Sequence, residues 1–284
     1  MNYNEILLNS AKKSGNITCM GLDPKVEVLP EGMEVTEFFK ILFKEMKSQN
    51  LIPAAFKPNV GYYHSLDKPR EGNFKGSIAL STVLDMLDEY FPEIPVILDS
   101  KRGDIARSSL NYEIEAFDCW NTEAVTVSPY MGTDSVSPFQ VAGKGIYVLN
   151  RTSNPGGRDL QNLKMDDGIP LYLKVSEKIV EWSENNKGLG AVVGATSMKE
   201  LADISSYYSD KEIPMLIPGV GSQGGSATDV INALNETSYP LYLARINSSS
   251  GLTHPWKKGV APENWLELCI TSISNLLKET KVNF

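Results

Sequence analysis

Residues 95–105 read PVILDSKRGDI, a short apolar run that ends in a dense group of charged residues. An apolar run of this length, bounded by turn-forming residues, is typical of a strand buried in a parallel sheet. Seven comparable runs lie at residues 17–22, 53–57, 124–128, 145–150, 189–194, 214–218 and 241–246. Together with residues 95–99 they make eight predicted strands, and most of them precede a segment of helical periodicity.

The segments between the predicted strands carry apolar residues at three- and four-residue spacing, which places one apolar stripe on a helix. The clearest sets are Val35, Phe38, Phe39, Leu42 and Met46; Leu80, Leu84 and Leu87; Leu171, Val175, Ile179 and Trp182; and Trp265, Leu268, Ile273 and Leu276. Strands that alternate with helices favour a parallel sheet, and eight such units are the number in a closed (β/α)₈ barrel.

An open, doubly wound α/β sheet is the rival fold. Its first strand is usually followed by a glycine-rich nucleotide-binding turn, and residues 20–24, MGLDP, do not form one. No linker, charge block or low-complexity segment divides the chain. We therefore predict one α/β domain over residues 1–284, a single (β/α)₈ TIM barrel.

The composition excludes several classes of partner. The chain has 27 basic and 35 acidic residues and a net charge of −8, which repels nucleic acid and anionic membrane surfaces. No apolar run approaches the roughly 18 residues that a membrane span needs, and residues 1–15 read as a short amphipathic helix, not as a signal peptide. We expect a cytoplasmic protein that binds neither nucleic acid nor membrane and that needs a locally basic pocket for any anionic ligand.

Cysteine and histidine are scarce. Cys19, Cys119 and Cys269 lie far apart without a Cys-x-x-Cys spacing, so we expect reduced, buried, apolar side chains. With only His64 and His254 in the chain, a three-histidine metal site is impossible. We interpret both histidines as polar loop residues and predict no metal site.

Charged residues gather where the predicted strands end, which is where a barrel places its catalytic groups. Because side chains alternate along a strand, Asp99 and Lys101 should share one face at the barrel mouth. Gly103 permits a turn there, which can bring the Asp104 carboxylate back to the Lys101 ammonium. Carboxylates keep a neighbouring lysine protonated, which suits Lys101 as a proton donor. The alternative is a surface ion-pair cluster in which Asp104 caps a helix, and the pattern alone does not choose between the two.

A turn of small residues, GVGSQGG at 219–225, follows the seventh predicted strand. Its backbone N–H groups can point at an anion, and the positive end of the next helix would assist them. Loops after strands seven and eight of a barrel are a common phosphate site. An ordinary structural turn is the alternative for this segment.

Residues 99–105, DSKRGDI, resemble the Asp-x-Lys-x-x-Asp-Ile signature of the orotidine 5′-phosphate decarboxylase family, whose longer bacterial form commonly reads KRGDI here. Further stretches resemble family motifs in the same order: GLDP at 21–24, FKPN at 56–59, RTSNPG at 151–156, VVGAT at 192–196 and PGVGSQGG at 218–225. The resemblance therefore covers most of the chain.

The resemblance implies a homodimer of barrels that converts orotidine 5′-monophosphate (OMP) to UMP and carbon dioxide in pyrimidine biosynthesis, without metal or organic cofactor. It implies that Lys101 donates a proton to C6 of the pyrimidine and that Asp99 lies beside the departing carboxylate. Asp104 would reach into the site of the partner subunit, and Lys57 and Asp23 would bind ribose hydroxyls. A fixed ammonium at C6 would stabilise the transition state more than the bound substrate, because electron density gathers on that carbon as the reaction proceeds.

The same resemblance assigns contacts along the substrate. Ser153 would contact the pyrimidine ring, and Ile105 would line the apolar side of the pocket. Gln223 and neighbouring backbone N–H groups would lie near the phosphate. Pro218, which begins the same motif, belongs to the expected substrate-binding residues.

One position departs from the family pattern. After the eighth strand the family usually supplies a phosphate-binding arginine in a stretch like Asn-Ser-Ser-Arg-Gly, whereas residues 247–251 read NSSSG, with Ser250 in the place of the arginine. We expect Arg245 to provide the positive charge instead, with Lys257 or Lys258 as the less favoured candidates.

Two other functions stay open. Asp-x-Lys-x-x-Asp is shared by Mg²⁺-dependent sugar-phosphate enzymes of the same barrel superfamily, such as 3-keto-gulonate 6-phosphate decarboxylase and the aldolase hexulose phosphate synthase. Lys57 and residues 153–156 favour the metal-free decarboxylase. Ser250 also suggests a third function, that of a non-catalytic barrel that binds phosphate. The presence of Asp99, Lys101 and Asp104 argues against it.

Overall fold

A parallel sheet of eight strands forms the centre of the computed structural model, which describes residues 1–221, 224–256 and 258–283. The strands follow one another in the order β2-β1-β8-β7-β6-β5-β4-β3. Their bounds are β1 Thr18–Leu22, β2 Ala55–Pro58, β3 Ile97–Arg102, β4 Ala124–Val127, β5 Gly145–Arg151, β6 Leu189–Val193, β7 Met215–Pro218 and β8 Ala244–Ser248.

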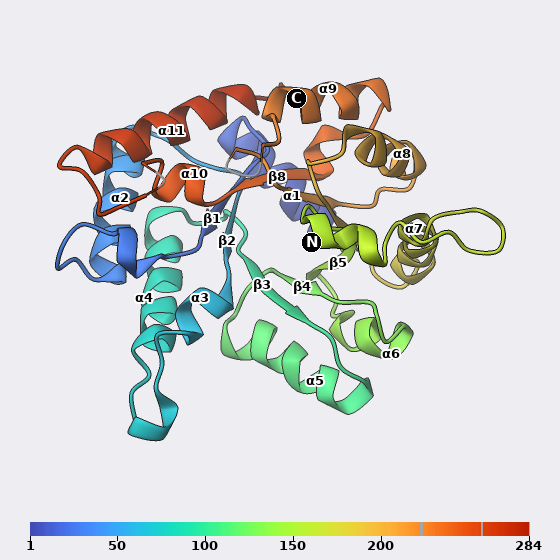
Figure 1. Ribbon diagram of the computed structural model, residues 1–284, viewed down its shortest axis with the longest axis horizontal. Helices are drawn as coiled ribbons and strands as arrows, with labels where there is room; N and C mark the ends of the chain where they lie inside the picture. The colour runs from blue at the N-terminus through green and yellow to red at the C-terminus, as the bar shows by residue number, and fades with distance from the viewer. Residues whose placement is uncertain (222–223, 257, 284) are drawn as a thin grey trace.

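The sheet curls into a nearly closed barrel, with helices around it (Figure 1). Its two edge strands, β2 and β3, meet through the isolated parallel bridges Phe56↔Val96 and Asn59↔Asp99. The predicted barrel and its eight strands are confirmed. The largest boundary differences fall at the end of β3 and at the start of β8, where Leu241–Leu243 forms a short 3₁₀ helix.

The helices are α1 Tyr3–Ser14, α2 Val35–Ser48, α3 Val60–His64, α4 Lys75–Tyr90, α5 Ala106–Ile114, α6 Thr133–Val136, α7 Leu171–Ser183, α8 Met198–Tyr208, α9 Ala227–Glu236, α10 Ser250–Thr253 and α11 Trp265–Glu279. The predicted apolar stripes bury the expected faces. In α2, for example, Phe39 and Leu42 are wholly buried in the core cluster. The outer helices therefore cover the sheet as the periodicity predicts.

Helix α1 closes the end of the barrel at which the strands begin. It starts with a capping box between Asn2 and Glu5, and the Tyr3 ring packs so tightly on the start of β5 that a Cβ at Gly145 would lie 2.4 Å from it. The predicted amphipathic helix at residues 1–15 is confirmed. With one end covered, a ligand has access from the opposite end, where the strands finish.

Cys19 and Cys269 are free and buried, and burial raises the pKa of each thiol to about 12. The expectation of burial is wrong for Cys119, which is free but exposed because it ends the π-helical turn Glu115–Cys119 on the outer surface. No helix in the described part of the chain is long and apolar enough to cross a membrane.

Candidate active site

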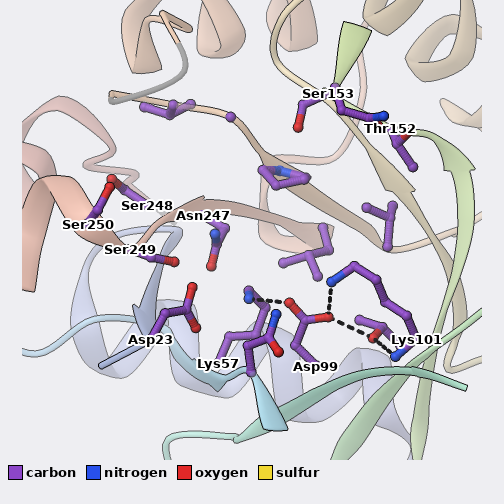
Figure 2. A pocket seen from close by; sticks show the side chains of 18 of the residues that line it. Asp23, Lys57, Asp99, Lys101, Thr152, Ser153, Asn247, Ser248, Ser249 and Ser250 are labelled. Carbon is purple, nitrogen blue, oxygen red and sulfur yellow. Dashed lines mark hydrogen bonds and ion pairs between the residues drawn. The ribbon is translucent and has the colours of Figure 1, made fainter. Parts of the chain in front are cut away.

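A cavity of about 510 Å³ opens at the carboxyl ends of the strands. Its polar walls come from segments far apart in sequence, which Figure 2 shows facing one another. These lining residues are Asp23 and Lys25 after β1; Lys57 and Asn59 at β2; Asp99 and Lys101 in β3; Thr126 in β4; Thr152, Ser153 and Asn154 after β5; Pro218, Gly219 and Val220 at β7; and Asn247, Ser248, Ser249, Ser250 and His254 at and after β8.

The Asp99 carboxylate is the centre of a charged row in this cavity (Figure 2). The Lys57 ammonium donates to its Oδ2 at 2.6 Å, and the Lys101 ammonium donates to its Oδ1 at 2.5 Å. The Thr126 hydroxyl donates to the same Oδ1 at 2.9 Å. Lys57 and Asp99 are only 4% and 6% exposed, whereas the Lys101 side chain is 47% exposed toward the cavity mouth.

For both buried residues of the row, Asp99 and Lys57, neighbouring charges affect the pKa more than burial does. Burial alone would raise the pKa of Asp99, but the ammonium groups of Lys57 and Lys101 hold it well below its usual range. Burial alone would lower the pKa of Lys57, but Asp99 and then Asp23 raise it above its usual value. Both groups therefore stay ionised around neutral pH.

The backbone reaches this arrangement through an irregularity in β3. The strand pairs with β4 at Leu98, shifts register, and pairs again at Arg102. Lys101 lies in this shift with a φ of +47°, and its N–H donates to the Thr126 hydroxyl at 2.9 Å. The structure thus brings Asp99 and Lys101 together as the sequence predicts, but through a bulge, and not by the simple alternation on which the prediction rested.

Asp104 and Ile105 lie outside the cavity of their own chain. The Asp104 carboxylate accepts the N–H of Ile105 at 2.7 Å, and within the described residues it forms no ion pair with Lys101. Ile105 is 56% exposed and does not line the cavity. The expectation that the turn returns Asp104 to its own chain's lysine is therefore wrong, and the place of Ile105 in the pocket is not reproduced within one chain.

The expectation that Arg245 supplies the positive charge for the phosphate is wrong. It is fully buried at the start of β8, and its guanidinium donates to the Leu7 carbonyl and to the Ser10 hydroxyl, both at 2.6 Å. Helix α1 carries both acceptors and covers the opposite end of the barrel. Arg245 lies near the start of β8, so its guanidinium ties the helix to the barrel and does not line the cavity.

Ser153 and Pro218 line the cavity as expected, and so does Asp23. Gln223, expected near the phosphate, lies outside the described residues, as does Lys257.

The interpretation of both histidines as loop residues is wrong for His64, which ends helix α3. His254 does lie in the loop after α10, but it is a cavity-lining residue that is 3% exposed. The Nε2 of His254 has no hydrogen-bond partner within the described residues, and the same holds for the Oδ1 atoms of Asp23 and Asn247 in the same cavity. Buried polar atoms normally find a partner, so these three atoms mark where a polar ligand would bind.

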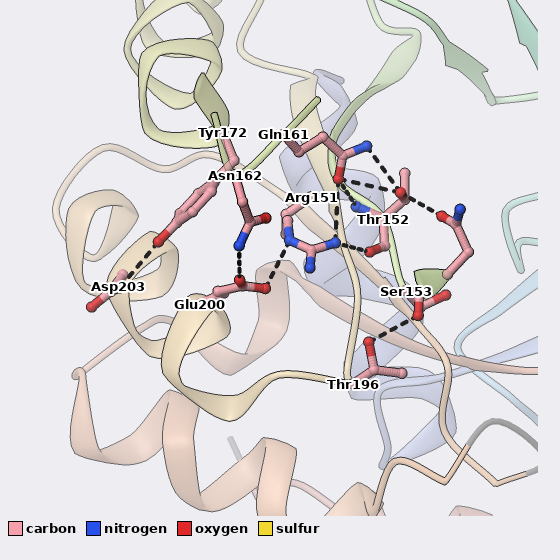
Figure 3. Close-up of polar contacts among 10 residues, drawn as sticks. Arg151, Thr152, Ser153, Gln161, Asn162, Tyr172, Thr196, Glu200 and Asp203 are labelled. Carbon is pink, nitrogen blue, oxygen red and sulfur yellow. Dashed lines mark hydrogen bonds and ion pairs between the residues drawn. The ribbon is translucent and has the colours of Figure 1, made fainter. Parts of the chain in front are cut away.

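A second polar network supports the loop after β5 (Figure 3). The buried Arg151 guanidinium lies 2.7 Å from Glu200 Oε2 of α8, a charge contact that is not an aligned hydrogen bond. Gln161 Oε1 accepts the Thr152 N–H at 2.9 Å, and the Thr196 hydroxyl donates to the Ser153 carbonyl at 3.0 Å. Through Arg151 and Thr196, these contacts tie the cavity-lining segment 152–154 to α8 and to the loop that precedes it.

Some lining residues were given no role in the sequence analysis. Asn59 and Asn247 were quoted within motifs only, and Lys25 was not singled out, although all three stand at or just beyond strand ends. Thr126 lies inside a strand and His254 follows the short helix α10, and neither position carries a signal in a single sequence.

Fold and site together define a (β/α)₈-barrel enzyme with a lysine–aspartate–lysine row at the mouth of the barrel. A sequence profile described as the orotidine 5′-phosphate decarboxylase / HUMPS family matches residues 54–238. The chain belongs to the orotidine 5′-phosphate decarboxylase family, whose members are carboxy-lyases.

Two bacterial relatives support this assignment. The chain is 39% identical to the orotidine 5′-phosphate decarboxylase of Cupriavidus metallidurans over 236 residues, 82% of this chain and 83% of the relative. It is 39% identical to that of Herpetosiphon aurantiacus over 230 residues, 80% of this chain and 82% of the relative. Among solved structures, the Leishmania donovani OMP decarboxylase superposes with a TM-score of 0.76 at 30% identity, over 99% of this chain and 100% of that one. The resemblance stated from the motifs is confirmed.

Proposed function

We propose that this chain decarboxylates OMP to UMP in pyrimidine biosynthesis, and that Lys101 is the proton donor. Membership of the family supports the reaction. The observation that carries the role of Lys101 is its ammonium, bound to a buried carboxylate at 2.5 Å while its side chain still reaches the cavity.

The proposed step breaks the bond between C6 and the carboxylate of the substrate. Carbon dioxide leaves, the electron pair remains on C6, and a proton moves from Lys101 Nζ to that carbon. Water returns a proton to the lysine afterwards. A fixed ammonium stabilises the developing carbanion more than it stabilises the substrate, so the contact lowers the barrier.

Asp99 has two functions in this proposal. It orients the Lys101 ammonium, which donates to its Oδ1. It also places a negative charge near the substrate carboxylate, and the repulsion between the two ends when neutral carbon dioxide departs. Lys57, on the other carboxylate oxygen, fixes the rotamer of Asp99.

The remaining walls fit the other parts of a nucleotide. Asp23 and Asn247 each present an unpartnered buried oxygen, within the described residues, that can accept from ribose hydroxyls. Ser153, held by the network after β5, would contact the pyrimidine. Pro218 and the backbone of Gly219 and Val220 would lie toward the phosphate.

A homodimer completes the proposed site. Asp104 and Ile105 adjoin a group of exposed apolar side chains on and near α5, namely Leu110, Ile114, Tyr130 and Met131. Exposed apolar groups of this kind commonly mark an interface. A second copy on this face would bury them and bring Asp104 and Ile105 to the partner subunit's cavity. We place this dimer of single-domain barrels in the cytoplasm, where the pathway's soluble intermediates are.

The Mg²⁺-dependent sugar-phosphate reaction is the second candidate because it shares the aspartate–lysine–aspartate pattern. Both oxygens of Asp99 already accept from lysines, and two ammonium groups repel a divalent cation. The donor set therefore favours the metal-free reaction.

Incubation of the purified protein with OMP, after dialysis against EDTA, tests the proposal. We expect loss of OMP absorbance and formation of UMP at a rate that added Mg²⁺ does not change. A well-folded protein that leaves OMP unchanged would contradict the proposal, and Mg²⁺-dependent turnover of a sugar phosphate would favour the second candidate.

A further inference from the structure

The substrate's phosphate needs a positive charge, and neither position 250 nor Arg245 supplies it. A phosphate monoester carries a charge of about −1.5 to −2 at pH 7. Position 250 is a serine, and Arg245 is bound to α1 at the other end of the barrel. Among the lysines lining the cavity, Lys57 and Lys101 both bind Asp99.

Lys25 is the third lysine of the cavity wall, and it lies beside the loop that lacks the arginine. It follows β1, which pairs with β8 up to Met20↔Ser248. The next residue, Gly21, has Ser249 packed directly on it, since a Cβ there would lie 1.8 Å from the Ser249 hydroxyl. The chain leaving β1 and the serine loop leaving β8 therefore form one corner of the cavity.

Two basic side chains of this corner, Lys25 and His254, have polar atoms without a partner among the described residues. Across the described ranges, Lys25 takes part in no ion pair, unlike Lys57 and Lys101. His254, after α10, is 3% exposed, and its Nε2 has no partner in the described part of the chain. Burial, and then the positive charge of Lys25, lower the pKa of His254. The Lys25 ammonium and the His254 ring therefore face the same corner of the cavity. An anion placed there would satisfy both groups.

We infer that Lys25 provides the positive charge for the substrate's 5′-phosphate, in place of the arginine that the family carries after β8, and that His254 and the Ser248 and Ser249 hydroxyls complete this subsite. The inference rests on the proposed function for the identity of the substrate. It assigns phosphate recognition to β1 in addition to the loops after β7 and β8.

The test compares OMP with orotidine, the same substrate without its phosphate. Lys25→Ala should lower kcat/KM for OMP by roughly 10- to 100-fold, the effect of removing a hydrogen bond to a charged group, and should change kcat/KM for orotidine less than about twofold. Lys25→Arg should restore most of the activity toward OMP. Lys44→Ala, at an exposed position of α2, is the control for a general loss of positive charge, and we expect no effect.

Equal losses for OMP and orotidine in Lys25→Ala, or no loss for either, would overturn the inference. So would a selective loss for OMP in Lys257→Ala or Lys258→Ala while Lys25→Ala stays like the wild type. If the wild type does not turn over OMP, the proposed function fails, but titration with inorganic phosphate still tests the subsite. Lys25→Ala should then bind phosphate at least tenfold more weakly than the wild type, and equal binding would overturn the subsite itself.

Discussion

The Lys101 ammonium binds the Asp99 carboxylate at 2.5 Å, although β3 shifts its register between Leu98 and Arg102 and Lys101 has a φ of +47°. A left-handed conformation costs a non-glycine residue roughly 1–2 kcal/mol. The Thr126 hydroxyl offsets this cost because it accepts the Lys101 N–H and donates to Asp99 Oδ1. One hydroxyl thus fixes both the backbone and the carboxylate that hold the lysine.

Thr126→Val should therefore lower kcat. The substitution keeps the shape of the side chain but leaves the Lys101 N–H without its acceptor, a loss of about 1–3 kcal/mol. We expect kcat for OMP to fall about 10- to 100-fold with little change in KM, and Thr126→Ser to stay near the wild type. Steady-state kinetics checks this, and a Thr126→Val enzyme with unchanged kcat would contradict it.

The buried Lys57–Asp99 pair predicts how stability depends on pH. The folded pKa of Asp99 is depressed, so its contribution is complete above the unfolded value of about 3.9 and is lost as pH falls toward the folded pKa. The folded pKa of Lys57 is raised, so its contribution is complete below about 10.4 and is lost as pH rises toward the folded pKa. The pair is therefore intact from about pH 4 to about pH 10.

We expect Asp99→Asn to lower the free energy of unfolding at pH 7 by about 3–5 kcal/mol, because it leaves the Lys57 charge buried and unpaired. Denaturant titrations at pH 3 and pH 7 measure this effect. The variant should lose less stability than the wild type between pH 7 and pH 3. An equal loss in both proteins would show that Asp99 does not carry the acid dependence.

The Arg151–Glu200 contact should act on substrate binding through segment 152–154. Glu200→Gln leaves the Arg151 charge without its partner and loosens the loop that carries Ser153. We expect KM for OMP to rise about tenfold while kcat changes less than threefold, the pattern of lost uniform binding. Asp203→Asn is the matched control, since Asp203 lies on the same helix but its side chain contacts Tyr172 and not the loop. A similar KM in both variants would refute the positioning role.

Complementation between two inactive variants tests the partner-subunit role of Asp104. Lys101→Ala and Asp104→Ala should each be nearly inactive as homodimers. In a heterodimer, one cavity then receives an intact Lys101 from one chain and an intact Asp104 from the other. Mixing the two after reversible dissociation should restore roughly a quarter of wild-type activity, given random pairing in a symmetric dimer. No recovery in a verified heterodimer would place Asp104 in the site of its own subunit, and an active Asp104→Ala homodimer would place it outside catalysis.

The barrel follows from the sequence because its signals are local and repeated. The run at residues 95–99 and its seven counterparts are bounded by turns, and the stripe that includes Phe39 and Leu42 has one helical period. The ends of the strands also indicated Asp23, Lys57, Asp99 and Lys101. These features depend on the order of residues along the chain, which a single sequence contains.

The rest of the site depends on packing between distant segments. Arg245 was expected in the pocket because a charge was missing there, but its position near the start of β8 directs it to α1. The predicted strand at 241–246 placed Arg245 near its end, whereas the observed strand Ala244–Ser248 places it near the start. His254 reaches the cavity through the turn after α10, and the bulge at Lys101 depends on Thr126 of the neighbouring strand. Neither relation is encoded by local spacing.

Turnover of OMP by Lys101→Ala, with circular dichroism to confirm folding, tests the central claim most directly. In the proposed mechanism the ammonium of Lys101 supplies both the proton and the electrostatic stabilisation, so its removal should lower kcat by at least about 10³-fold while the spectrum matches the wild type. A folded Lys101→Ala enzyme with kcat within tenfold of the wild type would contradict the account.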